Sequence, residues 1–230
     1  MCSWNGLVET MINRIINLIF PPKCIFCGTI LNTDTKIEIC KECYEQISFK
    51  EEASINPQGK YNYYDSVICV CDYSGIVKEA IRRYKFYNKP SYYRTFARLL
   101  AQKIKELTQW QKFDMIVSVP LHPNRERNRG YNQSYLIARQ LSRELGIKNE
   151  SRLLVRVKNT NSQSLLKRDD RLINIKDAFK ITNASKIEGK TMFLVDDILT
   201  TGSTLNECSR VLKEAGAKKI VAAVIASGRR

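Results

Sequence analysis

The sequence has no hydrophobic run that approaches the ~18 residues of a membrane-spanning helix, so we expect no stable insertion in a membrane. Its N-terminus also lacks the basic segment and uninterrupted apolar block of a secretory signal, and this absence favours a cytoplasmic protein. No internal repeat or low-complexity tract divides the chain. Its 230 residues, 43% of them hydrophobic, predict one globular domain with at most a smaller module beside it.

Acidic side chains are scarce: the chain has 23 Asp and Glu against 38 Lys and Arg, a formal net charge of +15. Residues 1–60 are nearly balanced, with 6 basic and 7 acidic side chains, so the excess positive charge lies in the rest of the chain. This excess favours a polyanionic partner, either a phosphorylated sugar or nucleic acid. A basic surface that contacts only solvent would have the same composition.

Cysteine, in contrast, is plentiful. In a cytoplasmic chain, eight cysteines favour bound metal or buried thiols over disulfides. Two C-x2-C pairs, Cys24 with Cys27 and Cys40 with Cys43, supply four thiolates, enough to close a tetrahedral zinc site with no position left for water. Gly28 suits the tight turn after the first pair. We predict structural zinc, with a redox C-x2-C pair or an iron–sulfur centre as alternatives.

The segments on either side of these cysteines define an N-terminal module. Apolar residues within 7–19 follow a helical pattern that ends at two prolines, and residues 50–62 are polar. Because the polar face of the helix has a single cation, we expect the helix to pack on its own chain rather than lie on a membrane. We place the domain boundaries at 1–60 and 61–230.

One stretch combines a strand, a loop and a helix. Residues 193–195 are apolar, Asp196 and Asp197 follow them, and a helical pattern of apolar residues begins at Leu205. Between the acids and the helix, four hydroxyl groups surround one glycine, in Thr200, Thr201, Gly202, Ser203 and Thr204. These hydroxyls, the backbone N–H groups at the helix start and the helix dipole suit a phosphate, and the glycine lets the backbone approach it.

The two carboxylates would repel that phosphate unless a sugar hydroxyl donates to them or a hard cation such as Mg²⁺ intervenes. They follow a predicted strand, and open α/β sheets bind ligands at the carboxyl ends of their strands. A phosphate at the helix and sugar hydroxyls at the acids describe a ribose 5-phosphate. This stretch resembles the signature of type I phosphoribosyltransferases for phosphoribosyl pyrophosphate (PRPP). The alternative is a buried strand that ends in two acids before a capped helix.

Hydrophobic patterns elsewhere predict the rest of an α/β domain. We expect strands at 65–73, 115–119 and 153–157, helices at 76–84, 93–110 and 133–145, and a loop at 120–133. The loop contains Arg125 and Arg129, and its place after a core strand suits a pyrophosphate. The single histidine, His122, lies there too; it can act as a proton donor, but we favour a role in anchoring the loop.

A second basic segment, 156–179, is too long and polar for an ordinary connection in a compact domain. A lid that closes over a charged substrate needs mobility and cations. We predict such a lid here, with contacts to pyrophosphate from Lys167, Arg168 and Arg171.

Cations and aromatic side chains alternate just after the helix at 76–84, in Lys85, Phe86, Tyr87 and Lys89. This alternation suits single-stranded DNA, because the aromatic rings stack with bases while the cations neutralise phosphates. Aromatic side chains that simply cover the domain are an equally good interpretation.

Taken in order, these motifs resemble the ComF family of phosphoribosyltransferase-like proteins, over nearly the whole chain. The motifs are the two C-x2-C pairs, V-P-L-H-P, R-G-Y-N-Q, R-x3-T-x2-Q, K-R-x2-R-x2-N-x3-A-F and D-D-I-L-T-T-G-S-T. The resemblance implies a zinc module, a type I phosphoribosyltransferase fold with a mostly parallel sheet flanked by helices, and a role in natural transformation. Family members tend to have Lys-Tyr-x-Gly where this chain has Lys85-Phe86-Tyr87-Asn88.

Three functions fit these observations. A Mg²⁺-dependent transferase would hold the 5-phosphate of PRPP at residues 200–204 and its ribose at the catalytic acids Asp196 and Asp197, with an unidentified acceptor. A nucleic-acid-handling factor would keep the same pocket as a sensor or docking site. An adaptor would bind a protein of the DNA-uptake machinery through its zinc module. We favour a PRPP-binding protein that acts in DNA uptake, and we leave catalysis open.

Overall fold

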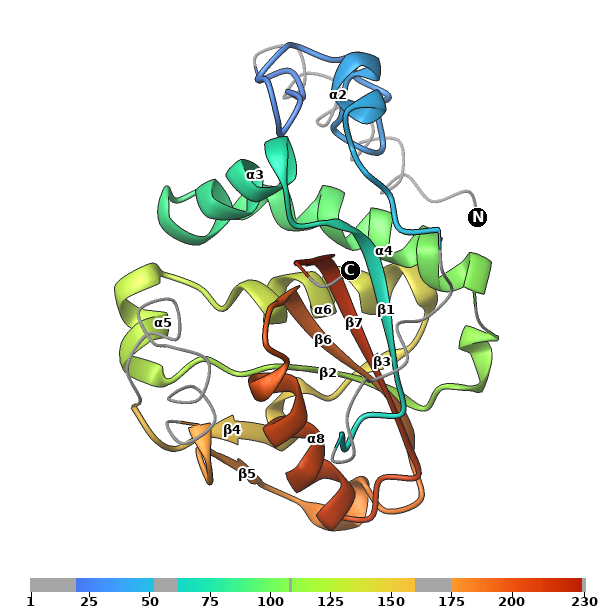
Figure 1. Cartoon of the computed structure of the whole chain (residues 1–230), viewed down its shortest axis with the longest axis vertical. Helices are drawn as coiled ribbons and strands as arrows, with labels where there is room; N and C mark the ends of the chain where they lie inside the picture. Colours follow the sequence, from blue (N-terminus) through green and yellow to red (C-terminus); the bar gives the residue numbers. More distant parts are fainter. Residues whose placement is uncertain (1–19, 52–61, 108, 160–174, 229–230) are drawn as a thin grey trace, which may run out of the picture.

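A five-stranded sheet forms the centre of the protein (Figure 1). The computed structural model describes residues 20–51, 62–107, 109–159 and 175–228. The strands lie in the order β1-β7-β6-β2-β3, and all neighbours run parallel. Their bounds are Ser66–Asp72 (β1), Met115–Ser118 (β2), Lys148–Asn149 (β3), Thr191–Leu199 (β6) and Lys219–Ser227 (β7). A separate antiparallel pair consists of β4 (Leu154–Arg156) and β5 (Phe179–Ile181).

Helices cover both faces of the sheet. Side chains from α3, α4 and α6 pack against one face, and side chains from α8 pack against the other. The α-helices are α2 (Lys41–Glu45), α3 (Gly75–Phe86), α4 (Tyr93–Leu107), α5 (Pro123–Arg129), α6 (Gln133–Leu145) and α8 (Ser203–Glu214). Single 3-10 turns occur at Pro90–Tyr92, Trp110–Lys112, Ser151–Leu153 and Ala184–Lys186.

Strand β6 is covered by helices on both of its faces. Phe193 and Val195 pack with the α3, α4 and α6 side chains, whereas Met192 and Leu194 pack with those of α8. A strand covered on both faces is apolar at every position rather than at every second one. The first charged residues of β6 after this run, Asp196 and Asp197, therefore lie near its carboxyl end, between the two helical layers.

The cysteine-containing residues 20–51 pack on the main domain. The backbone N–H of Lys50 donates to the carbonyl of Val70 at 2.9 Å, so the chain beyond the cysteines pairs with the edge of β1. Three apolar side chains of this module are buried in the same cluster as α3 and α4: Ile25, Phe26 and Ile47. The predicted linker falls largely among residues 52–61, outside the described part, and the domain boundary there stays a prediction.

The α/β fold class and the helix at 133–145 are confirmed, but the expectation of a loop over 120–133 is wrong. Helix α5 forms there, because Pro123 fits the first helical position and His122 Nδ1 accepts a hydrogen bond from Asn124 N at 3.2 Å. His122 thus caps a helix, and the predicted role in anchoring a loop stays untested.

The expected strand at 153–157 forms as β4, but it pairs with β5 instead of joining the main sheet. The sheet ends at the two-residue strand β3, which the hydrophobic pattern did not indicate. The predicted helix at 7–19 lies outside the described residues. Within the described ranges, no helix combines the length and apolar character that crossing a bilayer requires.

Candidate functional site

The two predicted acids lie side by side on β6 but differ in their partners. Ser134 Oγ, in the first turn of α6, donates to Asp196 Oδ1 at 2.8 Å, and the backbone N–H of Asp197 donates to the same oxygen at 2.9 Å. Asp197 Oδ1 lies 2.9 Å from the ammonium of Lys85, at the end of α3. The Asp197 residue is only 6% exposed. Two helices that pack on the same sheet face therefore hold the acid pair.

The hydroxyl-bearing turn connects β6 to α8. Gly202 has φ 78°, a left-handed conformation that glycine adopts without strain, and its carbonyl accepts from Asn206 N at 2.8 Å. Thr201 Oγ1 and Ser203 Oγ are 2.9 Å apart and share a hydrogen bond. Because α8 begins at Ser203, the positive end of its dipole lies at this turn.

The acids and the turn line one cleft of about 410 Å³, within the usual size of small-molecule sites. All five residues from Thr200 to Thr204 line it together with Asp196 and Asp197. Arg125 and Arg129 of α5 line it as well, as expected for a pyrophosphate site. We call this space the acid-pair cleft. The predicted lid residues Lys167, Arg168 and Arg171 lie outside the described residues.

The cleft places opposite charges close together. Burial raises the pKa of Asp196 to about 7, and the charge of Asp197 acts in the same direction, whereas Lys85 and the Ser134 hydrogen bond oppose the rise. Burial also lowers the pKa of Arg129, against the attraction of Asp197. The cleft can thus accept a sugar hydroxyl at its acids and an anion at its arginines.

Sequence reasoning missed three contributors to the cleft. Lys85 was assigned to nucleic acid alone, but its ammonium lies on Asp197. Ser134 directly follows the R-G-Y-N-Q motif, and Arg156, 8% exposed on β4, begins the R-x3-T-x2-Q motif. The motifs marked these positions, but only the tertiary fold brings residues of α6 and β4 to the cleft that the acids line.

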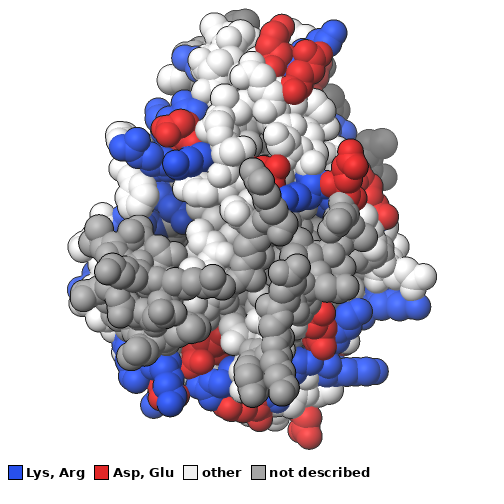
Figure 2. All heavy atoms as spheres, viewed as in Figure 1, with Lys and Arg blue, Asp and Glu red and all other residues white. Residues whose placement is uncertain are grey.

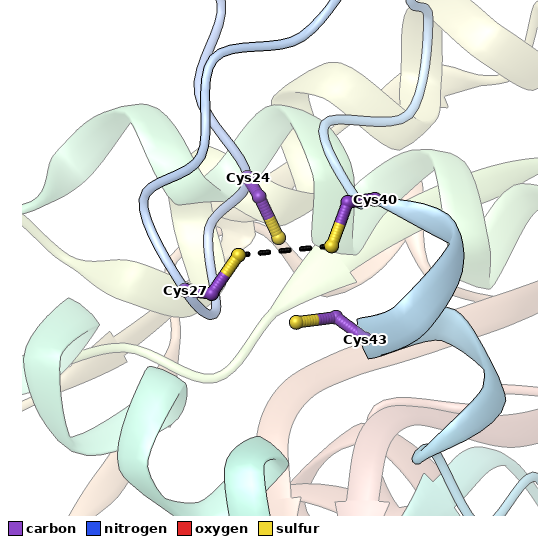
Figure 3. A group of neighbouring side chains, drawn as sticks. All are labelled: Cys24, Cys27, Cys40 and Cys43. Atoms are coloured by element: carbon purple, nitrogen blue, oxygen red, sulfur yellow. Dashed lines mark hydrogen bonds between the residues drawn. The ribbon is translucent and has the colours of Figure 1, made fainter.

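The four predicted zinc ligands form a compact cluster in which the side chains point toward one another (Figure 3). The sulfur atoms of Cys24, Cys27, Cys40 and Cys43 all lie within 4.8 Å of one another, and Cys27 Sγ is 3.6 Å from Cys40 Sγ. Zinc–sulfur bonds of about 2.3 Å in a tetrahedron put the sulfurs about 3.8 Å apart, so the cluster fits zinc. Gly28 has φ 82°, as the tight turn requires.

Comparisons with known proteins agree with this geometry. A phosphoribosyl transferase domain model matches residues 84–230, and a double zinc ribbon domain model matches residues 15–60. The chain is 34% identical to competence protein F of Haemophilus influenzae, over 79% of this chain and 81% of that protein. The chain belongs to the ComF family.

Other relatives match different shares of the chain. The DNA utilization protein YhgH of Escherichia coli K12 is 30% identical over 86% of each chain. Competence protein ComFC of Bacillus subtilis is 31% identical over 64% of this chain and 58% of that protein. As a ComF-family protein with a matching zinc ribbon, this chain has a structural zinc site at its four cysteines. With all four ligands from protein, this zinc has no open position for catalysis.

We predict that Cys43→Ser lowers the zinc content from about one atom per chain and lowers Tm on the order of 10 °C, because metal binding contributes directly to the folding of such modules. Elemental analysis and thermal unfolding measure the two effects. Cys208→Ala is the control: this buried cysteine of α8 lies outside the cluster, and its replacement should leave the zinc content unchanged. Equal zinc in wild type and Cys43→Ser would contradict the assignment.

The raised pKa of Asp196 predicts a pH-dependent stability. The folded state keeps a proton on Asp196 that the unfolded state releases near pH 4. The contribution of this proton to the free energy of unfolding is therefore complete below about pH 4 and is lost as pH rises through about 7. The groups that face Asp196 are Ser134, Lys85, Arg156, Asp197 and Cys208.

An asparagine side chain does not titrate, so Asp196→Asn should not lose stability as pH rises. Relative to wild type, its free energy of unfolding should increase between pH 5 and 8 by an amount on the order of 1 to 3 kcal/mol. Urea unfolding at several pH values measures the difference. A difference that is constant across this range would show that Asp196 does not titrate within it.

Proposed function

We propose that this ComF-family protein binds PRPP in its acid-pair cleft and handles single-stranded DNA in the cytoplasm during natural transformation. The observation that carries the proposal is the single cleft that joins the hydroxyl-bearing turn, the buried acid pair and two arginines. The names of its relatives, competence protein F and DNA utilization protein, support the role in DNA uptake.

Each part of PRPP has a matching group in the cleft. The 5-phosphate would lie at residues 200–204, where hydroxyls and the start of α8 favour an anion. The ribose hydroxyls would donate to Asp196 and Asp197, and the pyrophosphate would lie toward Arg125 and Arg129. Bound Mg²⁺ would offset the negative charge of the pyrophosphate oxygens.

Turnover of PRPP is the second candidate function, favoured by the same cleft. The acids would hold the ribose while positive charge develops at its reacting carbon, and the arginines would stabilise the leaving pyrophosphate. The acceptor that such a transfer needs is not indicated by any residue of the cleft, so binding is the function we propose first.

The DNA-binding part of the proposal rests on the end of α3. Phe86 is 63% exposed and Tyr87 is 55% exposed, so these rings do not cover the core. The guanidinium of Arg129 lies 5.2 Å from the centre of the Phe86 ring, and that of Arg82 lies 5.6 Å from the centre of the Tyr87 ring. Exposed rings beside cations provide a platform on which bases stack.

Titration calorimetry with PRPP and Mg²⁺ tests the first part. We expect Asp196→Asn/Asp197→Asn to weaken binding at least about 10-fold, because hydrogen bonds to charged groups contribute about 1.5–3 kcal/mol each. Asp34→Asn/Glu45→Gln removes two exposed acids of the zinc module and is the charge-matched control, expected to bind like wild type. Unchanged affinity in the acid-pair variant, with its fold intact, would show that PRPP binds elsewhere.

Fluorescence titration of an oligo(dT) strand tests the second part. Affinity should fall steeply with salt, because Lys and Arg release counterions from the phosphates. Phe86→Ala should weaken binding about 10-fold, since one stacked base contributes about 1–3 kcal/mol. Tyr63→Ala, at an exposed ring outside this platform, is the matched control. A flat salt profile, or equal losses in the two variants, would count against the platform.

A further inference from the structure

A second hollow adjoins the acid-pair cleft. This basic groove, about 640 Å³ in volume, lies between the end of α3 and α5. It is lined mainly by Lys85, Phe86, Asn88, Arg125, Arg127 and Arg129. Figure 2 shows Lys and Arg side chains on the left of the view, where α3 lies, with acidic atoms among them.

The two spaces share a wall. Lys85, Phe86, Arg125 and Arg129 line both the groove and the acid-pair cleft. A ligand in either space therefore contacts the same cations. Because these four residues belong to both spaces, we treat the groove and the cleft as one continuous site, with a sugar-phosphate end and an open end.

The open end has the chemistry of a nucleic-acid strand rather than of a small anion. Its described lining contains four cations and no carboxylate, and its one aromatic ring is exposed beneath Arg129. Asn88, two residues after Phe86, has a left-handed φ of 49°, and the Phe86 side chain is exposed. A strand can place phosphates on the arginines and a base on the ring.

The shared cations are not available to two polyanions at once. Lys85 is 2.9 Å from Asp197, so it already neutralises one buried charge. Burial keeps Arg129 from full solvation, and the charge of Asp197 holds it in its ionised form. A pyrophosphate on Arg125 and Arg129 would occupy the groups that a strand needs, and two polyanions on the same few cations would repel each other.

We propose that PRPP and single-stranded DNA compete for this continuous site, so that PRPP regulates access of the strand to the groove. The inference rests on the proposed function, because it requires that each ligand binds alone. It adds that a single protein molecule holds one of them at a time.

The test measures the affinity of fluorescent oligo(dT) at increasing PRPP in constant Mg²⁺. For competition, PRPP at ten times its own Kd raises the apparent Kd of the oligonucleotide about 11-fold. Sodium sulfate at matched ionic strength is the control, and it should change the apparent Kd of the oligonucleotide less than about 2-fold. An apparent Kd that PRPP leaves unchanged or lowers overturns the proposal.

Variants separate the two ends of the site. Arg127→Ala changes a residue that lines only the groove, so it should weaken the oligonucleotide, reduce its salt slope by about 1 and leave PRPP binding unchanged. Arg129→Ala should weaken both ligands. In Asp196→Asn/Asp197→Asn, the affinity of the oligonucleotide is first measured without PRPP, because the loss of Asp197 also releases Lys85. The same PRPP concentration should then raise the apparent Kd of the oligonucleotide far less than it does in wild type.

The outcomes also separate this inference from the proposed function. If PRPP alone or the oligonucleotide alone fails to bind the wild-type protein, both the proposed function and the proposed competition are contradicted. If both bind alone and also bind together, only the competition is overturned.

Discussion

The ion pair between Lys85 and Asp197 is the interaction on which the arrangement of the site depends. A carboxylate that is 6% exposed is costly unless a partner stays close, and the Lys85 ammonium at 2.9 Å is that partner. The need of Asp197 for a nearby cation holds the end of α3 against the carboxyl end of β6. It also brings Phe86, the next residue, to the mouth of the cleft. The acid-pair cleft and the exposed Phe86 ring are therefore adjacent because one buried charge needs neutralising.

The same turn of α3 connects three parts of the molecule. Arg83 Nη2 donates to the carbonyl of Phe26 at 2.8 Å, within the first C-x2-C loop. The Tyr84 hydroxyl donates to the carbonyl of Gln133 at 2.9 Å, at the start of α6. Lys85 follows with its contact to Asp197. Three consecutive residues thus join the zinc module, the helix that holds Asp196 through Ser134, and the acid pair, so the zinc module is part of the framework that positions the cleft.

The departure from the family pattern at Asn88 has a local explanation. A position with φ 49° suits glycine, and asparagine is among the few other residues that adopt this conformation at low cost. The chain therefore keeps the turn that a glycine would make. What changes is the side chain, because an amide at Asn88 now lines the groove beside Phe86 and Arg127.

The sequence alone determined the zinc ligands, the hydroxyl-bearing turn, the acid pair and the α/β class, because each depends on residue types at short, fixed spacing. The cleft could be foreseen only in part. Tertiary structure decided the remaining features. Lys85 pairs with Asp197, Ser134 holds Asp196, Arg156 comes from β4, and the loop expected at 120–133 contains a helix. These contacts join residues tens of positions apart or depend on a single cap. Their partners are set by how helices pack on a sheet, which local patterns do not encode.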